Sequence, residues 1–114
     1  MKKEDVVFVK HIIDNIENIK LFIKNITKSD FLGDEEKQYA VVRALEIIGE
    51  AVKNISQEIK DEYPKIEWKA IAGTRDRIIH AYFNVDLNIV WEIIKEDLPK
   101  LKKEISRILD KSEK

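Results

Sequence analysis

Three side chains capable of acid–base and phosphate chemistry lie close together in the segment RDRIIHAYF, residues 75–83. Arg75 offers a fork of donors for an anion, His80 an imidazole that titrates near neutral pH, and Tyr82 a hydroxyl. If the segment is helical, Asp76 shares a face with His80. Its carboxylate would fix one imidazole tautomer and leave the other nitrogen free to act as a base. The four residues therefore suit proton transfer beside a bound phosphate.

An ideal helix would not bring all these groups together. Arg75 precedes His80 by five residues, which is about 140° around the helix, and Tyr82 lies about 200° from His80. We therefore expect the helix to end near His80, or the site to be shared with a second subunit.

A base, an anion binder and a proton donor without metal ligands fit one reaction in particular. RNA carries its own nucleophile, the 2′-hydroxyl, which attacks the adjacent phosphate once its proton is removed and leaves a 2′,3′-cyclic phosphate. DNA lacks this hydroxyl and would be spared. A histidine near a helix end is more often structural, however, and the arginine, aspartate and tyrosine also suit solvated or rim positions. Spacing alone leaves both interpretations open.

The composition narrows the alternatives. The chain has 114 residues, no cysteine and two histidines, which suits one globular domain and excludes disulfides, thiolate zinc sites and a His-rich metal site. The net charge of −1 excludes a nucleic-acid clamp held by bulk electrostatics, so any RNA contact would be local. Without a membrane-length apolar run or a signal-peptide core in MKKEDVVFVKHIID, we expect a cytoplasmic protein that has no membrane partner. DNA is not expected as a partner either, because it lacks the 2′-hydroxyl.

The elements that must position the segment are predicted to be helical. Three glycines and two prolines barely interrupt the chain, and no strand-like alternation is present, which indicates an all-α fold. We expect one domain over residues 1–110 and a frayed tail at 111–114. The predicted helices span about 4–26, 34–59, 67–82 with a bend at Gly73, 86–95 and 98–110. A turn is expected at 27–34, and Asp97 and Pro99 are expected to start the last helix.

The second predicted helix is apolar around most of its circumference. From Tyr39 to Ile55 its polar side chains form one narrow stripe, which consists of Arg43, Glu46, Glu50, Lys53 and Asn54. Such a helix needs partners on more than one side, so we expect it to be the central helix of the bundle and also to serve a subunit interface. Gly49 costs about 1 kcal/mol relative to alanine, and a close helix crossing would compensate for that cost.

With its flanks, the segment resembles the HEPN superfamily, in particular the HepT-like toxins that are paired with minimal nucleotidyltransferases. RDRIIHAY matches an Arg–x4–His–x–Tyr pattern, and the resemblance extends to RALEIIGEAVKNIS at 43–56, YPKIEWKAIAGTRDRIIHAYF at 63–83 and VDLNIVWEIIKEDLPKL at 85–101. It implies a five-helix up-and-down bundle that forms a two-fold homodimer, in which the motifs of both subunits face a shared cleft.

The resemblance also implies residue roles. It points to the toxin of a type VII-like toxin–antitoxin system, a metal-independent endoribonuclease without cofactor, in which Arg75 and His80 are catalytic. Asp76 stands beside the arginine where the family often has asparagine, which places a carboxylate near a phosphate site. Tyr82 matches the acceptor of AMP groups that the cognate nucleotidyltransferase antitoxin attaches, and such groups would exclude RNA by bulk and charge. Because the family's site lies against the second helix, Glu46 or Glu50 could line the cleft.

Two other interpretations remain open. HEPN domains also resemble the helical substrate-binding domain of aminoglycoside nucleotidyltransferases, which would make this chain a non-catalytic nucleotide- or substrate-binding subunit. Alternatively, the motif is an interface network of a purely structural dimer. Elsewhere we expect a boundary position for His11, packing roles for Trp68 and Trp91, and a solvated basic face formed by Lys100, Lys102, Lys103 and Arg107.

Overall fold

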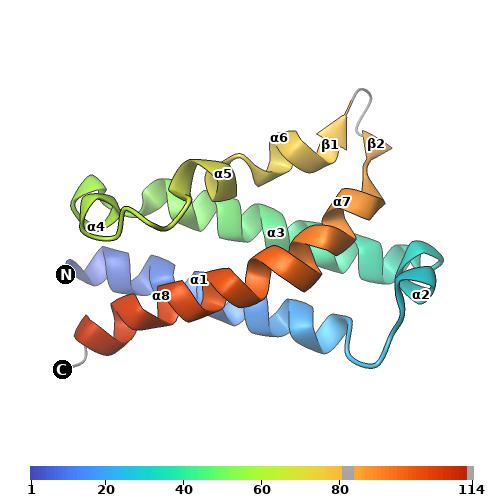
Figure 1. Cartoon of the computed structure of the whole chain (residues 1–114), viewed down its shortest axis with the longest axis horizontal. Coiled ribbons are helices and arrows are strands. Elements are labelled where there is room, and N and C mark those ends of the chain that lie inside the picture. The colour runs from blue at the N-terminus through green and yellow to red at the C-terminus, as the bar shows by residue number, and fades with distance from the viewer. Residues whose placement is uncertain (81–83, 113–114) are drawn as a thin grey trace.

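The computed structural model describes residues 1–80 and 84–112, and this part of the chain is predominantly helical. Four helical runs alternate in direction along the long axis of the molecule (Figure 1). They are α1 (Lys3–Phe22), α3 (Glu35–Asn54), the pair α5 (Trp68–Ala72) and α6 (Thr74–Ile78), and the series α7 (Leu87–Glu92), η2 (Ile93–Asp97) and α8 (Leu98–Ser112). Short helices α2 (Lys28–Leu32) and α4 (Gln57–Glu62) precede and follow α3. The prediction of an all-α class is confirmed.

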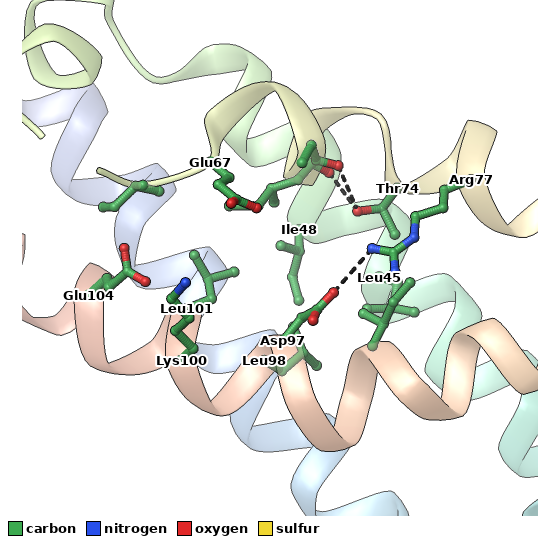
Figure 2. A pocket seen from close by; sticks show the side chains of 14 residues that line it. Leu45, Ile48, Glu67, Thr74, Arg77, Asp97, Leu98, Lys100, Leu101 and Glu104 are labelled. Atoms are coloured by element: carbon green, nitrogen blue, oxygen red, sulfur yellow. Dashed lines mark hydrogen bonds and ion pairs between the residues drawn. The ribbon is translucent and has the colours of Figure 1, made fainter. Parts of the chain in front are cut away.

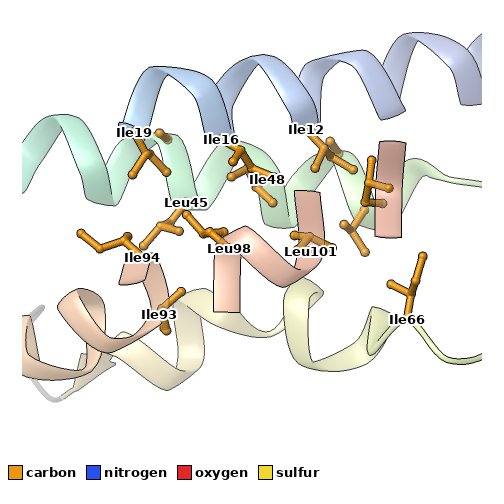
Figure 3. Close-up of a cluster of buried hydrophobic side chains, with 14 of the residues drawn as sticks. Ile12, Ile16, Ile19, Leu45, Ile48, Ile66, Ile93, Ile94, Leu98 and Leu101 are labelled. Carbon is orange, nitrogen blue, oxygen red and sulfur yellow. The ribbon is translucent and has the colours of Figure 1, made fainter. Parts of the chain in front are cut away.

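One apolar face of α1 forms part of the core against α3 and α8 (Figure 3). The α1 residues at spacings of three and four that are fully buried are Val9, Ile12, Ile16 and Ile19. Leu45 and Ile48 of α3 face them, and α8 contributes Leu101, Ile105 and Ile108. Burial of each such side chain contributes about 1.5–3 kcal/mol, so this cluster provides much of the stability of the fold.

Helix α3 is the central helix, as its pattern predicts, because it packs on α1 along one side and on α5 and α6 along another. Gly49 lies where α3 passes close to the backbone of α5. A β-carbon placed on it would lie 3.4 Å from the Ile71 carbonyl oxygen and 3.5 Å from that of Ala72. The expected close helix crossing is therefore confirmed, and it sets the position of the chain that leads to Arg75.

The second helix ends earlier than predicted. It stops at Asn54 rather than near residue 59, because Ile55 is extended, with φ −71° and ψ 137°. Ser56 then caps the separate helix α4, and its hydroxyl accepts a hydrogen bond from the Ile59 N–H at 3.4 Å. The predicted turn at 27–34 likewise contains α2. Thr27 and Asp30 form a reciprocal capping box there, a local signal that the turn prediction overlooked.

The third helical run bends at Gly73 as predicted but ends at Ile78, not at 82. The Ile78 carbonyl accepts a hydrogen bond from the Asp86 N–H at 2.7 Å, which ties the helix end to the chain that returns towards α7. Strand β1 (Ile79–His80) pairs antiparallel with β2 (Asn84–Val85), so this short hairpin is an exception to the helical prediction. The helix does end near His80, but Asp76 and His80 do not share a helical face.

The fourth and fifth predicted helices form one continuous run, so the predicted new start at Pro99 is wrong. Asp97 belongs to the π-helical turn η2 rather than capping a helix. A proline inside a helix lacks the N–H for one hydrogen bond and crowds the carbonyl four residues earlier. The wider turn immediately before Pro99 accommodates both defects without breaking the helix.

Candidate functional site

A surface groove brings together α3, α6 and the short hairpin, and Arg75 is one of its lining residues. The groove has a volume of about 420 Å³. Helix α3 contributes Tyr39, Val42 and Glu46, α6 contributes Arg75, and the hairpin contributes Ile79 and Val85. We call it the Arg75 groove. Its size lies in the range of small-molecule sites, and it combines apolar walls with a few polar groups.

Arg75 is exposed in the first turn of α6, and within the described residues its guanidinium has no hydrogen bond or ion pair. A planar guanidinium with open donors is suited to bidentate contact with the oxygens of a phosphate. Asp76 is also exposed but does not line the groove. The two neighbours therefore differ in their access to a groove-bound ligand.

The backbone of His80 lies in β1, where it pairs with Asn84, another residue of the groove lining. The imidazole of His80 and the whole of Tyr82 lie outside the described residues. The catalytic role of His80 and the acceptor role of Tyr82 thus remain predictions from the sequence.

The two glutamates proposed for the cleft have different positions. Glu46 lines the Arg75 groove, and its Oε2 lies 3.8 Å from Arg43 Nη1, one turn earlier on α3. Glu50 does not line the groove and accepts a hydrogen bond from Lys53 Nζ at 3.1 Å. Of the two, Glu46 is the carboxylate that could meet a groove-bound ligand.

Tyr39 is a groove residue that the sequence analysis missed. Its side chain is 77% exposed, the highest value among the large hydrophobic residues that the structure describes as exposed. The signal is present in the sequence, since Tyr39, Val42 and Glu46 are three and seven residues apart and so share one face of α3. The apolar character of the helix made Tyr39 look like one more packing residue.

A second pocket lies between α5–α6 and η2–α8 (Figure 2). Its volume of about 110 Å³ is well below the usual size of a ligand site. Across its rim Arg77 donates to Asp97 at 3.1 Å, and Thr74 Oγ1 donates to the Ile71 carbonyl at 2.8 Å. The Arg77–Asp97 contact joins the two runs, whereas the Thr74 contact lies within the α5–α6 run. This pocket is therefore a packing contact between the two runs rather than a substrate site.

Several other candidates from the sequence have structural contacts. Trp68 is buried, and its indole N–H donates to the Tyr63 carbonyl at 3.0 Å. The Trp91 ring lies 5.4 Å from that of Phe31. His11 is exposed on α1.

Within the predicted basic face, Lys102 forms an ion pair with Glu17. This ion pair lowers the pKa of Glu17 below its usual 4.5 and raises the pKa of Lys102 above 10.5.

Two further observations concern metal binding and membrane-spanning helices. Among residues 1–80 and 84–112, no three histidine, aspartate or glutamate side chains gather closely enough to hold a metal ion. None of the helices in this part of the chain combines the length and the apolarity needed to cross a membrane.

The described residues form a small, predominantly helical domain, and the Arg75 groove is its candidate site. The chain belongs to the HepT-like family, since the family profile described as "Ribonuclease HepT-like" matches residues 12–108. It is 44% identical to a "Probable ribonuclease HepT" of Thermococcus cleftensis over 95% of this chain and 98% of that protein. A "Putative RNase" of Methanocaldococcus jannaschii is also 44% identical, over 96% of this chain and 91% of the relative.

A third relative is longer than the chain. It is a "Gamma-glutamylcyclotransferase and putative RNase" of Methanocaldococcus jannaschii, 43% identical over the whole of this chain, which spans 51% of the relative's length. No solved structure matches the chain significantly. The family is thus established by sequence, and the names of its relatives support an RNase-like family at a general level.

Proposed function

We propose that this protein is a metal-independent endoribonuclease that uses Arg75 and His80 to cleave RNA through its own 2′-hydroxyl. The observation that carries the proposal is the exposed Arg75 guanidinium, which has no partner among the described residues and lies in a groove at the end of the helix that leads to His80. Membership of the HepT-like family and the names of the relatives support the same activity.

In the proposed reaction, His80 takes the proton from the 2′-hydroxyl. The 2′-oxygen then forms a bond to the adjacent phosphorus while the bond from phosphorus to the 5′-oxygen breaks. The leaving 5′-oxygen takes up a proton, with the Tyr82 hydroxyl as one candidate donor, and a 2′,3′-cyclic phosphate remains. Arg75 stabilises the negative charge that accumulates on the phosphoryl oxygens. The RNA supplies both the nucleophile and the leaving group, so the proposed reaction asks the protein only for proton transfer and charge stabilisation.

The proposal includes control by a partner enzyme. A cognate minimal nucleotidyltransferase, acting as the antitoxin of a type VII-like pair, would transfer AMP to the Tyr82 hydroxyl. Each added AMP brings a negative phosphate and an adenosine next to the catalytic residues, which repels RNA and fills space. In the proposed two-fold homodimer of up-and-down bundles, the motifs of both subunits face one cleft, so modification of either subunit would obstruct it.

An intact-mass measurement combined with an RNA assay tests this proposal. The protein is produced alone and together with the partner nucleotidyltransferase and ATP, and each form is incubated with total RNA. We expect an added mass in AMP units that is lost in Tyr82→Phe, and cleavage by the unmodified form alone. His80→Ala should abolish cleavage. An unmodified dimer that leaves RNA intact, or cleavage unchanged by His80→Ala, would refute the proposed activity.

A second candidate function is a nucleotide- or substrate-binding subunit of a two-component nucleotidyltransferase. The acidic side of the groove favours it, because Glu35 and Glu46 reduce the attraction for a phosphate chain and the net charge is −1. In that case the protein would bind ATP stably in the presence of the partner while RNA is not consumed.

A further inference from the structure

Within the part of the chain that the structure describes, Tyr39 is an aromatic side chain outside the hydrophobic core. It is 77% exposed on the groove side of α3, and among the described residues no ring or cation stacks on it. Other aromatic rings among the described residues do have such contacts, as the Phe31–Trp91 pair shows. An exposed tyrosine ring on a helix that lines a groove offers a surface on which a planar group can stack.

The charges of the Arg75 groove are divided between its two walls. The α6 wall carries the Arg75 guanidinium, whereas the α3 wall carries the carboxylates of Glu35 and Glu46 together with the Tyr39 ring. The carboxylates repel phosphate but accept hydrogen bonds from N–H groups, which the edges of nucleobases carry. A nucleotide is therefore complementary to the groove in one orientation, with its phosphate at α6 and its base at α3.

We propose that the Arg75 groove holds one nucleotide of single-stranded RNA, with the phosphate on Arg75 and the base stacked on Tyr39. The inference rests on the proposed ribonuclease function and deepens it, because it identifies Tyr39 as a positioning residue and single-stranded RNA as the substrate class. In a duplex both faces of each base are already covered by neighbouring bases, so only an unpaired base can stack on the tyrosine.

Stacking on an aromatic side chain is tolerant of sequence, since every base has a flat face. The groove should therefore distinguish paired from unpaired RNA strongly and the four bases only weakly. Because Tyr39 acts by holding the substrate, its loss should raise KM much more than it lowers kcat.

The test uses the 114-residue chain and a single-stranded 2′-O-methyl oligonucleotide that contains one 2-aminopurine. The 2′-O-methyl groups prevent cleavage, and the fluorescence of 2-aminopurine reports stacking. Tyr39→Ala should weaken binding about 5- to 100-fold and reduce the fluorescence quenching. Tyr39→Phe keeps the ring and should bind within about twofold of the wild type. Leu21→Ala, which shortens another exposed apolar side chain (69% exposed) outside the groove, is the matched control and should bind normally.

Cleavage of unmodified RNA by the same variants separates this inference from the proposed function. If the wild type cleaves RNA and Tyr39→Ala binds and cleaves with unchanged Kd and KM, the role of Tyr39 is refuted while the ribonuclease function stands. If Tyr39→Ala shifts the oligomeric state in sedimentation and leaves affinity per folded site unchanged, Tyr39 is a subunit contact and the inference is equally refuted. A wild type that binds the probe through Tyr39 but cuts no RNA would refute the ribonuclease function alone.

Discussion

The guanidinium of Arg77 donates a hydrogen bond to the carboxylate of Asp97 at 3.1 Å and so joins α6 to η2 (Figure 2). Two residues earlier on the same short helix, Arg75 has no such partner within the described residues and lines the Arg75 groove. The two arginines of this helix thus have different environments. Arg77 lies at the packing contact between two helical runs, and Arg75 lies at the candidate site. The pair offers a matched comparison between an arginine in a structural ion pair and the arginine proposed to act on RNA.

We predict opposite effects for the two alanine substitutions. Arg75→Ala should lower the rate of RNA cleavage about 10²- to 10³-fold, because it removes a donor aimed at developing charge. Its melting temperature should stay unchanged. Arg77→Ala should retain cleavage and lose about 0.2–1 kcal/mol of stability, the usual value of a half-exposed ion pair.

Cleavage assays and thermal unfolding of both variants check this prediction. A main effect of Arg75→Ala on stability, with activity proportional to the folded fraction, would instead support the interpretation of the motif as an interface network.

Asp5 connects the start of α1 to the α3–α4 junction. It is 2% exposed, and its carboxylate accepts hydrogen bonds from the Ser56 N–H and from the Ser56 hydroxyl, both at 2.8 Å. Asp5→Ala should lower the free energy of unfolding by about 1.5–3 kcal/mol, because the half-buried Ser56 donors lose a charged acceptor. Chemical denaturation measures this loss. Asp14→Ala, at an exposed aspartate of the same helix, should cost far less; equal costs would contradict the assignment.

The features that the sequence predicted correctly are those encoded locally. The helix starts predicted near residues 34 and 86 are confirmed, because the carboxylates of Asp34 and Asp86 each accept a hydrogen bond from the N–H three residues later, at 3.1 Å in both cases. The end of α6 was predicted too late because it depends on a hydrogen bond between Ile78 and Asp86, which no local propensity reveals. The helix through Pro99 was missed for a similar reason, since tertiary packing outweighs the local cost of proline.

The candidate site was predictable only in part. The order of residue types identified Arg75, because an arginine and a histidine at that spacing suggest phosphate chemistry. Tyr39 lies 36 positions before Arg75 in the sequence and shares a groove with it only through the packing of α6 on α3. A pattern read along one helix does not show which of its faces a distant segment will cover.

The Glu17–Lys102 ion pair predicts a pH-dependent contribution to stability. The hydrogen bond from Lys102 lowers the pKa of Glu17 from its usual 4.5, so the pair's contribution is present above that value and is lost as the pH falls through the folded-state pKa. Glu17 in turn raises the pKa of Lys102 above 10.5, so the contribution is lost again as the pH rises through that higher value.

Glu17→Gln should therefore lower the melting temperature slightly near neutral pH, and the difference from the wild type should vanish in acid below the folded pKa of Glu17. The effect is small because both side chains are at least a third exposed, and added salt should reduce it further. Melting curves over a pH series measure it. A difference of the same size in acid would show that the substitution acts through packing and not through charge. Asp14→Asn, one turn earlier on α1, serves as the control.

Gly49 links the packing of the bundle to the position of Arg75. Because a β-carbon there would lie 3.4 Å from the Ile71 carbonyl oxygen, alanine just fits, and its better helix propensity, worth about 1 kcal/mol, should leave Gly49→Ala neutral or slightly stabilising. Gly49→Val adds methyl groups that must push α5 away from α3, which costs about 1–3 kcal/mol.

Since α5 leads through Gly73 into α6, the same displacement should move Arg75 relative to the α3 wall of its groove. We therefore expect Gly49→Val to lower RNA cleavage by more than its loss of folded protein explains, whereas Gly49→Ala keeps full activity. Gly33→Val is the matched control, because a β-carbon at Gly33 meets no atom closer than 3.7 Å. Denaturation curves measure the stability of each variant. Rates of RNA cleavage are then compared under conditions in which every variant is folded. Normal cleavage by folded Gly49→Val would show that Arg75 acts independently of the α3–α5 crossing.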